Sequence, residues 1–347
     1  MALNTGPSTA RPEGDGTASG AVLAIDAGNS KTDVAVVAAD GSVRGAARGG
    51  GFQPPAVGVR TAVDALAGTV VRALRAAGRP PVDQVTACLA NADLPREERE
   101  LTEALRERAW GVRTEVVNDT FAILRAGLPD DGSVRHGVAV VCGAGINCVG
   151  LAEDGRTHRF PAVGQLSGDW GGGSGLAAEA LWSAARGADG RGPRTALSEA
   201  LPAHFGLNSM ARLIEAFHLG DLRRERRHEL TPVLFAVAAG GDPVARSLVE
   251  RQADEIVALA AVSLDRLGLL GDRTPVFLGG SVAAARHPQL HERLLAELAL
   301  RVPKAVVSVI TAPPVLGAGL RGLDGLAAPP GAYARLRDHY RSPADRS

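Results

Sequence analysis

Two short glycine-containing turns carry residue types that bind phosphate groups. The first is Asp26-Ala27-Gly28-Asn29-Ser30-Lys31-Thr32-Asp33, between two segments rich in β-branched residues. Successive backbone N–H groups in such a turn form a concave surface that suits phosphate oxygens. Ser30, Thr32 and Lys31 would add hydroxyl donors and a positive charge, and Asp26 could hold Mg²⁺ through water. The spacing fits neither G-x-x-x-x-G-K-[ST] nor a dinucleotide-binding fingerprint, and for this motif alone an ordinary hairpin turn remains the alternative.

A second turn, Cys142-Gly143-Ala144-Gly145-Ile146-Asn147-Cys148, has the same character. Together the two turns predict two loops that bind a polyphosphate from opposite sides. A third segment, Leu278-Gly279-Gly280-Ser281, follows a buried strand, and its glycines would let backbone pack flat against a base or ribose; a plain strand-to-helix turn is the alternative. Cys142 and Cys148 have no His or further Cys nearby, which favours small core residues over a metal site.

Lysine and asparagine are scarce, so the places where they occur are informative. Of the 38 basic residues 36 are arginine, and the only lysines are Lys31 and Lys304. Four of the six asparagines lie in the two glycine turns or at the ends of predicted strands: Asn29, Asn91, Asn118 and Asn147. Their amides can both donate to and accept from hydroxyls or phosphates.

Composition excludes several classes of function. The chain has 347 residues and a formal charge of +0, which argues against nucleic acid as a partner. No apolar run approaches the ~20 residues that span a bilayer, so we expect no membrane partner. Three unclustered cysteines fit a reducing cytoplasm.

Strand and helix patterns alternate, and one pattern occurs twice. Strand, glycine-rich turn, strand, Asp-Gly turn, strand is found at residues 21–47 and again at 137–161. This repetition predicts two related α/β domains. We expect a disordered tail (1–20), a first domain (21–132), a second domain (133–326) with a helical insert near 175–270, and a C-terminal tail (327–347) with a short helix at Tyr333–Tyr340.

Hydrophobic periodicity and turn signals give approximate element bounds. The predicted strands are Ala21–Ile25, Asp33–Ala38, Ser42–Ala47, Gln84–Ala90, Thr114–Asn118, Gly137–Cys142, Cys148–Ala152, Thr157–Pro161, Thr274–Leu278 and Ala305–Ile310. The predicted helices outside the insert are Val57–Ala77, Arg96–Trp110, Thr120–Ala126, Gln289–Leu300 and Val315–Leu326.

The order of these parts resembles the actin, sugar-kinase and Hsp70 superfamily. Within it the chain is similar to the BadF/BadG/BcrA/BcrD ATPase family, in its N-acetylglucosamine kinase-like branch, over about Ala21 to Leu326. The motifs that carry the resemblance are Asp26–Asp33, Leu89-Ala90-Asn91-Ala92-Asp93, Asn118-Asp119, Gly143–Asn147, Gly168-Asp169-Trp170-Gly171, Asp189-Gly190-Arg191-Gly192-Pro193 and Leu278–Ser281. The resemblance implies two ribonuclease H-like domains around a nucleotide cleft. It also implies phosphorylation of a sugar hydroxyl by MgATP, with N-acetylglucosamine or glucosamine as the first candidates.

The resemblance also implies roles for individual residues. Asp93 falls where family members place the general base that accepts the sugar hydroxyl proton; the alternative is that it caps the following helix. Asp119 would order Mg²⁺ or bind the sugar, and an N-cap role is equally open. The nucleotide would contact Gly28, Asn29, Ser30, Lys31, Thr32, Gly143, Ala144, Gly145, Gly279, Gly280 and Ser281. The sugar would contact Gln53, Asn91, Asp93, Asn118, Asp119, Asn147 and Asp169, and the metal Asp26 and Asp119. A homodimer is implied as well.

Three positions depart from the family pattern, the first in the phosphate loop and the other two around the sugar. Ala144 replaces a threonine of many relatives, Gln53 stands where they have asparagine, and Trp170 stands where they have a glutamate that helps recognise an amino sugar. Trp170 would stack on a sugar face or simply pack.

Two other interpretations remain beside a sugar kinase. One is a nucleotide- or sugar-binding sensor without turnover. The other is the ATPase activator of an acyl-CoA dehydratase or reductase, which would need cysteines at a dimer interface to hold an iron–sulfur cluster. A related DNA-binding repressor would need a helix-turn-helix domain, for which the N-terminal tail is too short.

Overall fold

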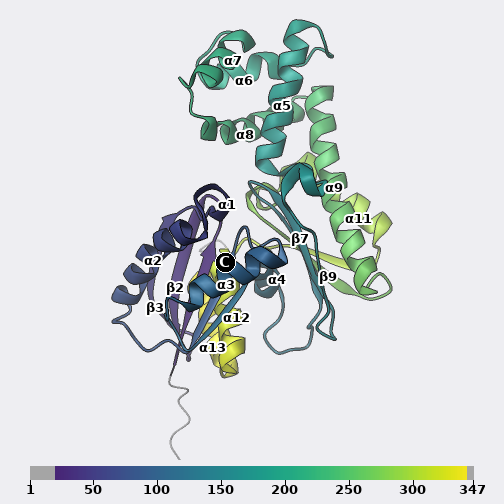
Figure 1. Ribbon diagram of the computed structural model, residues 1–347. Helices are drawn as coiled ribbons and strands as arrows, with labels where there is room; N and C mark the ends of the chain where they lie inside the picture. The colour runs from purple at the N-terminus through teal and green to yellow at the C-terminus, as the bar shows by residue number, and fades with distance from the viewer. Residues whose placement is uncertain (1–19, 342–347) are drawn as a thin grey trace, which may run out of the picture.

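The computed structural model describes residues 20–341 and contains two five-stranded mixed sheets with helices on both faces (Figure 1). The first sheet has the order β3-β2-β1-β4-β5 and the second β10-β9-β6-β7-β8. In each, three antiparallel strands are followed by two parallel ones, so the second sheet repeats the topology of the first. This confirms the predicted α/β fold with two ribonuclease H-like units.

The strands lie close to their predicted positions. They are β1 (Ala21–Ala27), β2 (Lys31–Ala38), β3 (Val43–Gly50), β4 (Gln84–Leu89), β5 (Arg113–Asn118), β6 (Gly137–Cys142), β7 (Ile146–Leu151), β8 (Thr157–Arg159), β9 (Thr274–Gly279) and β10 (Ala305–Val309). Gly41 and Gly155 both have φ of 85° in the two Asp-Gly turns, a backbone region that favours glycine. Both hairpins follow from that turn chemistry.

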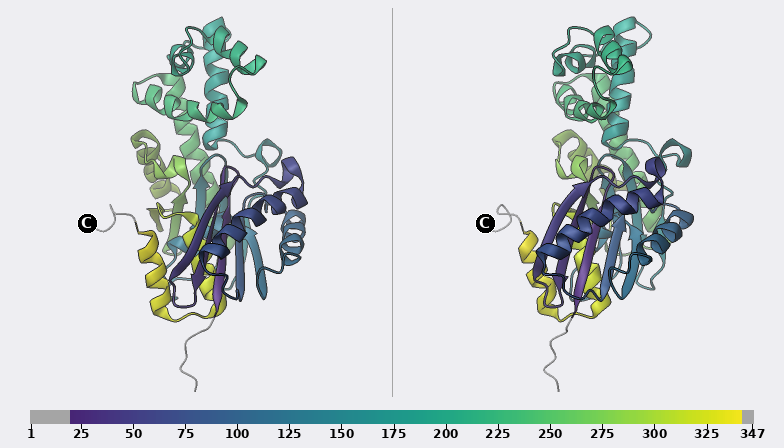
Figure 2. Two further views of the ribbon diagram at one scale, coloured as in Figure 1. Left: turned by 90° about the vertical axis from the view of Figure 1, so that its left-hand side faces the viewer. Right: turned by 60° about the vertical axis from the view of Figure 1, so that its left-hand side comes forward.

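The helices are α1 (Pro54–Val57), α2 (Val59–Ala76), α3 (Pro95–Arg106), α4 (Thr120–Gly127), α5 (Gly172–Asp189), α6 (Leu197–His204), α7 (Met210–Leu219), α8 (Leu230–Ala239), α9 (Pro243–Leu267), α10 (Ser281–Ala284), α11 (Pro288–Arg301), α12 (Pro314–Leu326) and α13 (Pro330–Tyr340). Two 3-10 turns, η1 (Gly164–Ser167) and η2 (Arg224–Glu229), complete the set. Helices α5 to α8 rise above the sheets as a helical arm (Figures 1 and 2).

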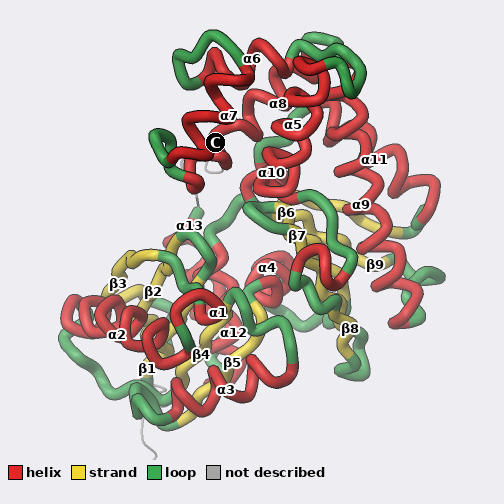
Figure 3. Tube along the Cα trace, turned by 45° about the horizontal axis from the view of Figure 1, so that its top comes forward, coloured by secondary structure: helices red, strands yellow, loops and turns green. Residues whose placement is uncertain are grey.

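The inner faces of the two sheets are covered by helices exchanged between the repeats. Helix α4, which follows β5 of the first sheet, packs through Phe121 and Leu124 on Ala139 and Val149 of the second sheet. Helix α12, which follows β10 of the second sheet, packs on the first sheet instead. The two helices touch each other between the sheets (Figure 3). The predicted domains, with boundaries at 132 and 326, assign α4 to the first domain and α12 to the second, whereas each helix packs on the sheet of the other domain. Chain order alone does not say on which sheet a helix packs.

Glycines on α12 allow its close approach. A Cβ added at Gly317 would lie 1.8 Å from the carbonyl oxygen of Ala122, and one at Gly322 would lie 2.1 Å from Val22. No larger residue fits at either position without moving backbone or a buried strand. The junction of the two domains therefore depends on backbone contact.

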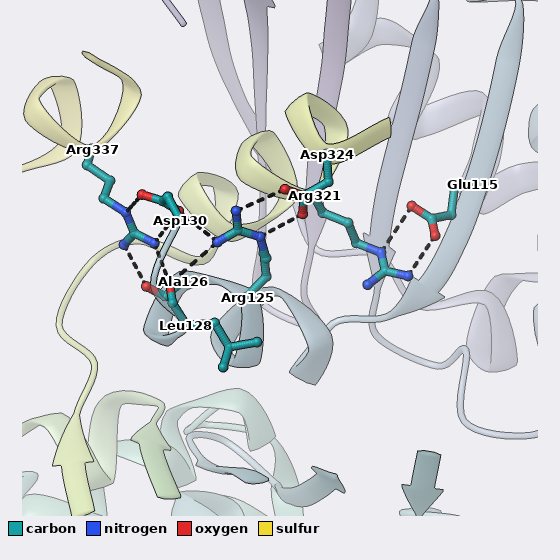
Figure 4. Close-up of polar contacts among 8 residues, drawn as sticks. All are labelled: Glu115, Arg125, Ala126, Leu128, Asp130, Arg321, Asp324 and Arg337. Carbon is teal, nitrogen blue, oxygen red and sulfur yellow. Dashed lines mark hydrogen bonds and ion pairs between the residues drawn. The ribbon is translucent and has the colours of Figure 1, made fainter. Parts of the chain in front are cut away.

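The short helix predicted at Tyr333–Tyr340 is confirmed as α13, but its placement in a C-terminal tail was wrong. Its residues Ala332, Tyr333 and Leu336 are buried against the inner face of the first sheet. The helix also joins an arginine network at the end of α4 (Figure 4). Its contacts run from Arg337 to Asp130 and to the carbonyls of Ala126 and Leu128, from Arg125 to Asp130 and Asp324, and from Arg321 to Glu115. The predicted tail at 1–20 lies, apart from Gly20, outside the described residues.

Within residues 20–341, no single helix is long and apolar enough to cross a membrane. One pair, Arg224–Ala239 with Pro243–Leu267, meets the length and composition criteria only together and is bent by 112°.

Candidate active site

The first glycine turn joins β1 to β2 at the end of the first sheet. The Gly28 N–H donates to the Lys31 carbonyl at 2.9 Å, which closes the turn, and Asn29, Ser30 and Lys31 are exposed. Lys31 Nζ lies 3.3 Å from Asp33, but the lysine side chain is half exposed. A surface pair of this kind contributes little, so Lys31 is free to contact an anion.

Thr32 does not have the predicted role in this structure. It pairs with Ala27 across β1 and β2, and Ala27 belongs to the core under α2 and α3. Side chains alternate between the faces of a strand, so Thr32 points into that core while Lys31 points to the inner face. Only 3 % of Thr32 is exposed, so the structure does not support the predicted contact of its hydroxyl with phosphate.

Asp26 is a buried carboxyl among other carboxyls. It lies opposite Asp33 in the β1–β2 pair and is 6 % exposed. Burial raises its pKa from 3.8 to about 8, the carboxylates of Asp119 and Asp33 add to this, and Lys31 opposes it. Burial also raises the pKa of Asp119 to about 6. Two such carboxyls in electrostatic contact favour a cation.

Magnesium fits this pair better than a metal that needs several protein ligands. Within the described part of the chain, no three His, Cys, Asp or Glu side chains are grouped as a metal site. Mg²⁺ characteristically uses one or two carboxylates and completes its shell with water and phosphate oxygens. Asp26 and Asp119 are residues that could supply such a donor set.

Asp119 stands at the N-cap position of α4, but its side chain makes no capping bond there. Asn118 Oδ1 accepts from the Thr120 N–H instead, at 3.0 Å. The N-cap alternative for Asp119 is therefore wrong, because the neighbouring amide takes that role.

Three loops meet around Asn91, which has φ of 63°, a left-handed conformation that asparagine tolerates better than most residues. Its Nδ2 donates to Asn29 Oδ1 at 2.9 Å and to the Phe52 carbonyl at 3.0 Å. Gln53 Nε2 donates to the Asn29 carbonyl at 2.9 Å. The structure thus brings together the predicted nucleotide residue Asn29 and the predicted sugar residues Asn91 and Gln53, with these amides joining the loops.

Asp93 lies where residues of both domains converge. Its Oδ1 accepts from Asn118 Nδ2 at 2.7 Å and from Asn147 Nδ2 at 3.3 Å, and Asn147 also donates to Asn118 Oδ1 at 3.2 Å. Burial raises the pKa of Asp93 to about 7; Asp119, Glu97 and Asp169 add to this. A carboxyl titrating near neutral pH suits a general base.

The helix-cap alternative for Asp93 is also wrong. Glu97 Oε2 accepts from the backbone N–H groups of Asp93 and Leu94, at 3.2 and 3.0 Å, so α3 is capped by its own glutamate. The carboxyl of Asp93 is left to its asparagine partners.

The second glycine turn and the Gly279-Gly280 segment pack against each other. A Cβ at Gly280, where φ is 86°, would lie 2.5 Å from the backbone of Cys142. The first turn of α5 also joins this cluster, since the Gly173 and Ser174 N–H groups donate to the carbonyls of Gly143 and Ala144. Ala144, Gly145 and Ser281 remain exposed, so one surface includes residues of both predicted nucleotide segments.

Asp169 and Trp170 are largely engaged within the protein. Asp169 Oδ2 accepts from Ser167 Oγ at 2.6 Å and from the Gly164 N–H at 3.0 Å, which holds the η1 turn. The guanidinium of Arg251 lies 4.1 Å from the centre of the Trp170 ring. One face of that ring is therefore covered, which favours packing over sugar stacking.

The motifs did not predict two residues that support the site. Arg159 at the end of β8 donates to the carbonyls of Ala92 and Asp93. Gln252, wholly buried in α9, accepts from the Gly172 N–H at 2.7 Å. In the sequence, Gln252 could have been noticed as a polar residue at an apolar position of a predicted helix. No feature of the sequence distinguished Arg159, because the chain contains so many arginines.

The repeated sheets, the paired glycine turns and the exchanged inner helices define an actin-type ATPase fold. The model of the BadF/BadG/BcrA/BcrD ATPase family matches residues 23–321, and the chain belongs to this family. Helix α13 lies beyond the matched residues.

Similar proteins agree with this assignment. The chain is 26 % identical over 246 residues to the N-acetyl-D-glucosamine kinase of Dictyostelium discoideum, covering 68 % of this chain and 75 % of that protein. It is 24 % identical over 193 residues to the N-acetylmuramic acid/N-acetylglucosamine kinase of Clostridium acetobutylicum, covering 56 % of this chain and 62 % of that protein. The chain thus spans less than two thirds of the Clostridium kinase.

Solved structures share the fold. A structural-genomics target from Chromobacterium violaceum, assigned provisionally as an N-acetylglucosamine kinase, superposes with a TM-score of 0.68 at 22 % identity, covering 88 % of this chain and 99 % of that one. A ROK family glucokinase from Streptomyces griseus, solved with glucose and AMPPNP, gives a TM-score of 0.53 at 18 % identity, covering 92 % and 100 %.

Proposed function

We propose that this protein transfers the γ-phosphoryl group of ATP to a hydroxyl of an amino sugar or related hexose. The observation that carries the proposal is Asp93, held by asparagines from both domains and with a pKa raised to about 7. The names of the curated relatives support a kinase and put N-acetylglucosamine first among the substrates to test.

Asp93 would act as the general base. Asn118 and Asn147 donate to one carboxylate oxygen, which orients the carboxylate and leaves the other oxygen for a sugar hydroxyl. The hydroxyl proton passes to Asp93 as the sugar oxygen bonds to the γ-phosphorus and the bond to the β-phosphate oxygen breaks. A base with a pKa near neutral can take up this proton and release it afterwards.

The nucleotide would lie between the glycine turns. The exposed turn at Asn29–Lys31 provides N–H groups and a lysine for one side of the phosphates, and the Ala144-Gly145 turn faces the other. Gly280 and Ser281 would face the adenosine, whereas Gly279, the last residue of β9, is buried against Ile123, which does not support its predicted contact with the nucleotide. Asp26 and Asp119 would hold Mg²⁺, which neutralises phosphate charge when bound.

The surroundings of the predicted sugar residues bear on substrate choice. Gln53 Nε2 is bonded to the Asn29 carbonyl, and one face of the Trp170 ring is covered by Arg251, so neither side chain offers all of its polar groups or ring surface to a sugar. We therefore include N-acetylmuramic acid, glucosamine and glucose beside N-acetylglucosamine.

The ATPase-activator interpretation is disfavoured by the cysteines. Cys88, Cys142 and Cys148 are all free and buried, and burial raises the pKa of each thiol. None can reach a surface to share a cluster with a second copy. The homodimer implied by the resemblance remains a prediction.

The test is ADP formation from MgATP with each sugar, together with detection of the sugar phosphate. We expect sugar-dependent turnover in the wild type, unchanged in Asp272→Asn, an exposed carboxyl outside the site, and abolished in Asp93→Asn. Nucleotide binding without turnover on any sugar would favour the sensor, and sugar-independent hydrolysis would contradict the kinase.

A further inference from the structure

Arg159 connects the second domain to the loop that carries Asp93. It is the last residue of β8, and its side chain is 23 % exposed. One terminal nitrogen donates to the Ala92 carbonyl at 2.5 Å and to the Asp93 carbonyl at 3.1 Å, and the other donates to Glu98 Oε2 at 2.7 Å. All three acceptors belong to the first domain.

The planar guanidinium suits this arrangement. It carries five N–H donors in a fixed fork, so it can bind two carbonyls and a carboxylate at once, which an ammonium group cannot do with the same geometry. The ring of Phe121, on α4, lies 5.9 Å from its carbon. Arg159 thus contacts the Asp93 loop, α3 and α4.

Arg159 and Asn147 reach Asp93 from neighbouring strands. Arg159 pairs with Val149 across β7 and β8, and Asn147 lies two residues before Val149 on the same face of β7. Asn147 donates to the carboxylate of Asp93 while Arg159 donates to its carbonyl. The second domain therefore holds this residue at both its side chain and its backbone.

We infer that Arg159 is a positioning residue for the general base: it ties the Asp93 loop to the domain that carries the second glycine turn. The inference rests on the proposed function for the role of Asp93, but the contacts themselves do not. With Arg159 in place, the base and the Ala144-Gly145 turn keep a fixed separation, and small errors in such a separation are costly in phosphoryl transfer.

The charges around Asp93 provide a second, independent way to detect the effect of Arg159, through the pKa of Asp93. The groups that face Asp93 are Asp119 beyond β5, Glu97 on α3, Asp169 after η1 and Arg159 on β8. The three carboxylates raise the pKa of Asp93, and Arg159 lowers it. Glu98 partly neutralises Arg159 through their ion pair.

Removing Arg159 should therefore raise the pKa of Asp93, and removing the charge of Glu98 should lower it. Arg159→Met and Glu98→Gln would move the acidic limb of kcat/KM for the sugar in opposite directions, by about 0.5 to 1 pH unit. A purely structural role for Arg159 would not produce opposite signs.

The experiment compares four variants of the full chain. Arg159→Met removes all contacts, Arg159→Lys keeps the charge but not the fork, and Glu98→Gln changes the charge of the partner. Arg156→Gln is the matched control, since this exposed arginine lies on the same hairpin and bonds to Asp154. For each we measure kcat, KM for ATP and sugar, the pH profile, and hydrogen exchange of residues 91–94.

We expect Arg159→Met to lower kcat about tenfold to a hundredfold, with KM for ATP within a factor of about two, and to lose exchange protection at 91–94. Arg159→Lys should fall between it and the wild type, and Arg156→Gln should match the wild type. If Arg159→Met does not fold, the kcat loss in Arg159→Lys and the pH shift in Glu98→Gln decide the question.

An active wild type with unchanged kcat and pH profile in Arg159→Met would overturn the inference and leave the proposed function standing. A wild type inactive on every sugar would overturn the proposed function, and hydrogen exchange would then decide whether Arg159 positions the loop. Equal protection at 91–94 in Arg159→Met and wild type would overturn the positioning role on its own.

Discussion

Replacing Asp93 by asparagine should remove activity and stabilise the fold, and both effects come from the same surroundings. The carboxylate accepts from Asn118 and Asn147. An asparagine carbonyl can accept the same two bonds, so Asp93→Asn changes the charge with little change in shape. Loss of a general base lowers kcat by about 10² to 10⁴, and we expect that range here.

The stability effect follows from the raised pKa of Asp93. In the unfolded chain this carboxyl ionises near 3.8, and in the folded protein near 7. The folded wild type therefore loses stability as the pH rises through this interval, and the loss is complete above about 7. At ~1.4 kcal/mol per pH unit the full loss is about 4 kcal/mol, and we halve it to ~2 because the side chain is partly exposed.

Asp93→Asn is neutral at every pH and avoids this loss. Its melting temperature should equal that of the wild type near pH 4 and exceed it by about 4 °C at pH 8, with Asp272→Asn showing no pH-dependent difference. Thermal melts followed by circular dichroism at both pH values, beside ADP formation at pH 8, make the test. A melting difference independent of pH, or wild-type kcat in Asp93→Asn, would refute the reasoning.

Three further changes probe other parts of the site and its support. Asp26→Asn should abolish Mg²⁺-dependent turnover. Its melting temperature should exceed that of the wild type by an amount that grows up to about pH 8, because that is the raised pKa of the buried carboxyl in the wild type. Thermal melts of both proteins across this pH range test the second effect. Gly172→Ala should weaken ATP binding about tenfold, because φ is 68° and a Cβ would lie 2.5 Å from the Gly145 backbone; calorimetric titration with ATP checks this. Arg337→Met should cost about 2 kcal/mol by breaking charged hydrogen bonds at the end of α4, whereas Arg335→Met, at an exposed pair with Asp40, should cost less; urea unfolding of both variants decides.

The sequence predicted what depends on local chemistry. Both Asp-Gly hairpins, the strand ends at Asp26 and Asn118, and the glycine turns follow from backbone preferences within a few residues. Because strands of a repeated fold end at one edge, the motifs at those ends could also be expected to meet.

What the sequence could not predict depends on long-range placement. The burial of Thr32 depends on which face of β2 meets α2, and the exchange of α4 and α12 depends on how the two sheets pack. Helix α13 is short and polar in composition, and only its docking on the first sheet makes it part of the domain. Arg159 acquires a role only because β8 ends beside the Asp93 loop.

The carboxyls of the site form one electrostatic unit, and this links the state of the base to the state of the phosphate site. The carboxylate of Asp119 raises the pKa values of both Asp26 and Asp93. A cation bound to Asp119 would offset its negative charge and lower the pKa values of both Asp26 and Asp93. Asp93 would then be more fully ionised when the metal–nucleotide complex is present. Before that complex binds, burial and, after it, the carboxylate of Asp119 keep much of Asp93 protonated near pH 7. The arrangement would thus favour an ionised base when a phosphoryl donor is in place.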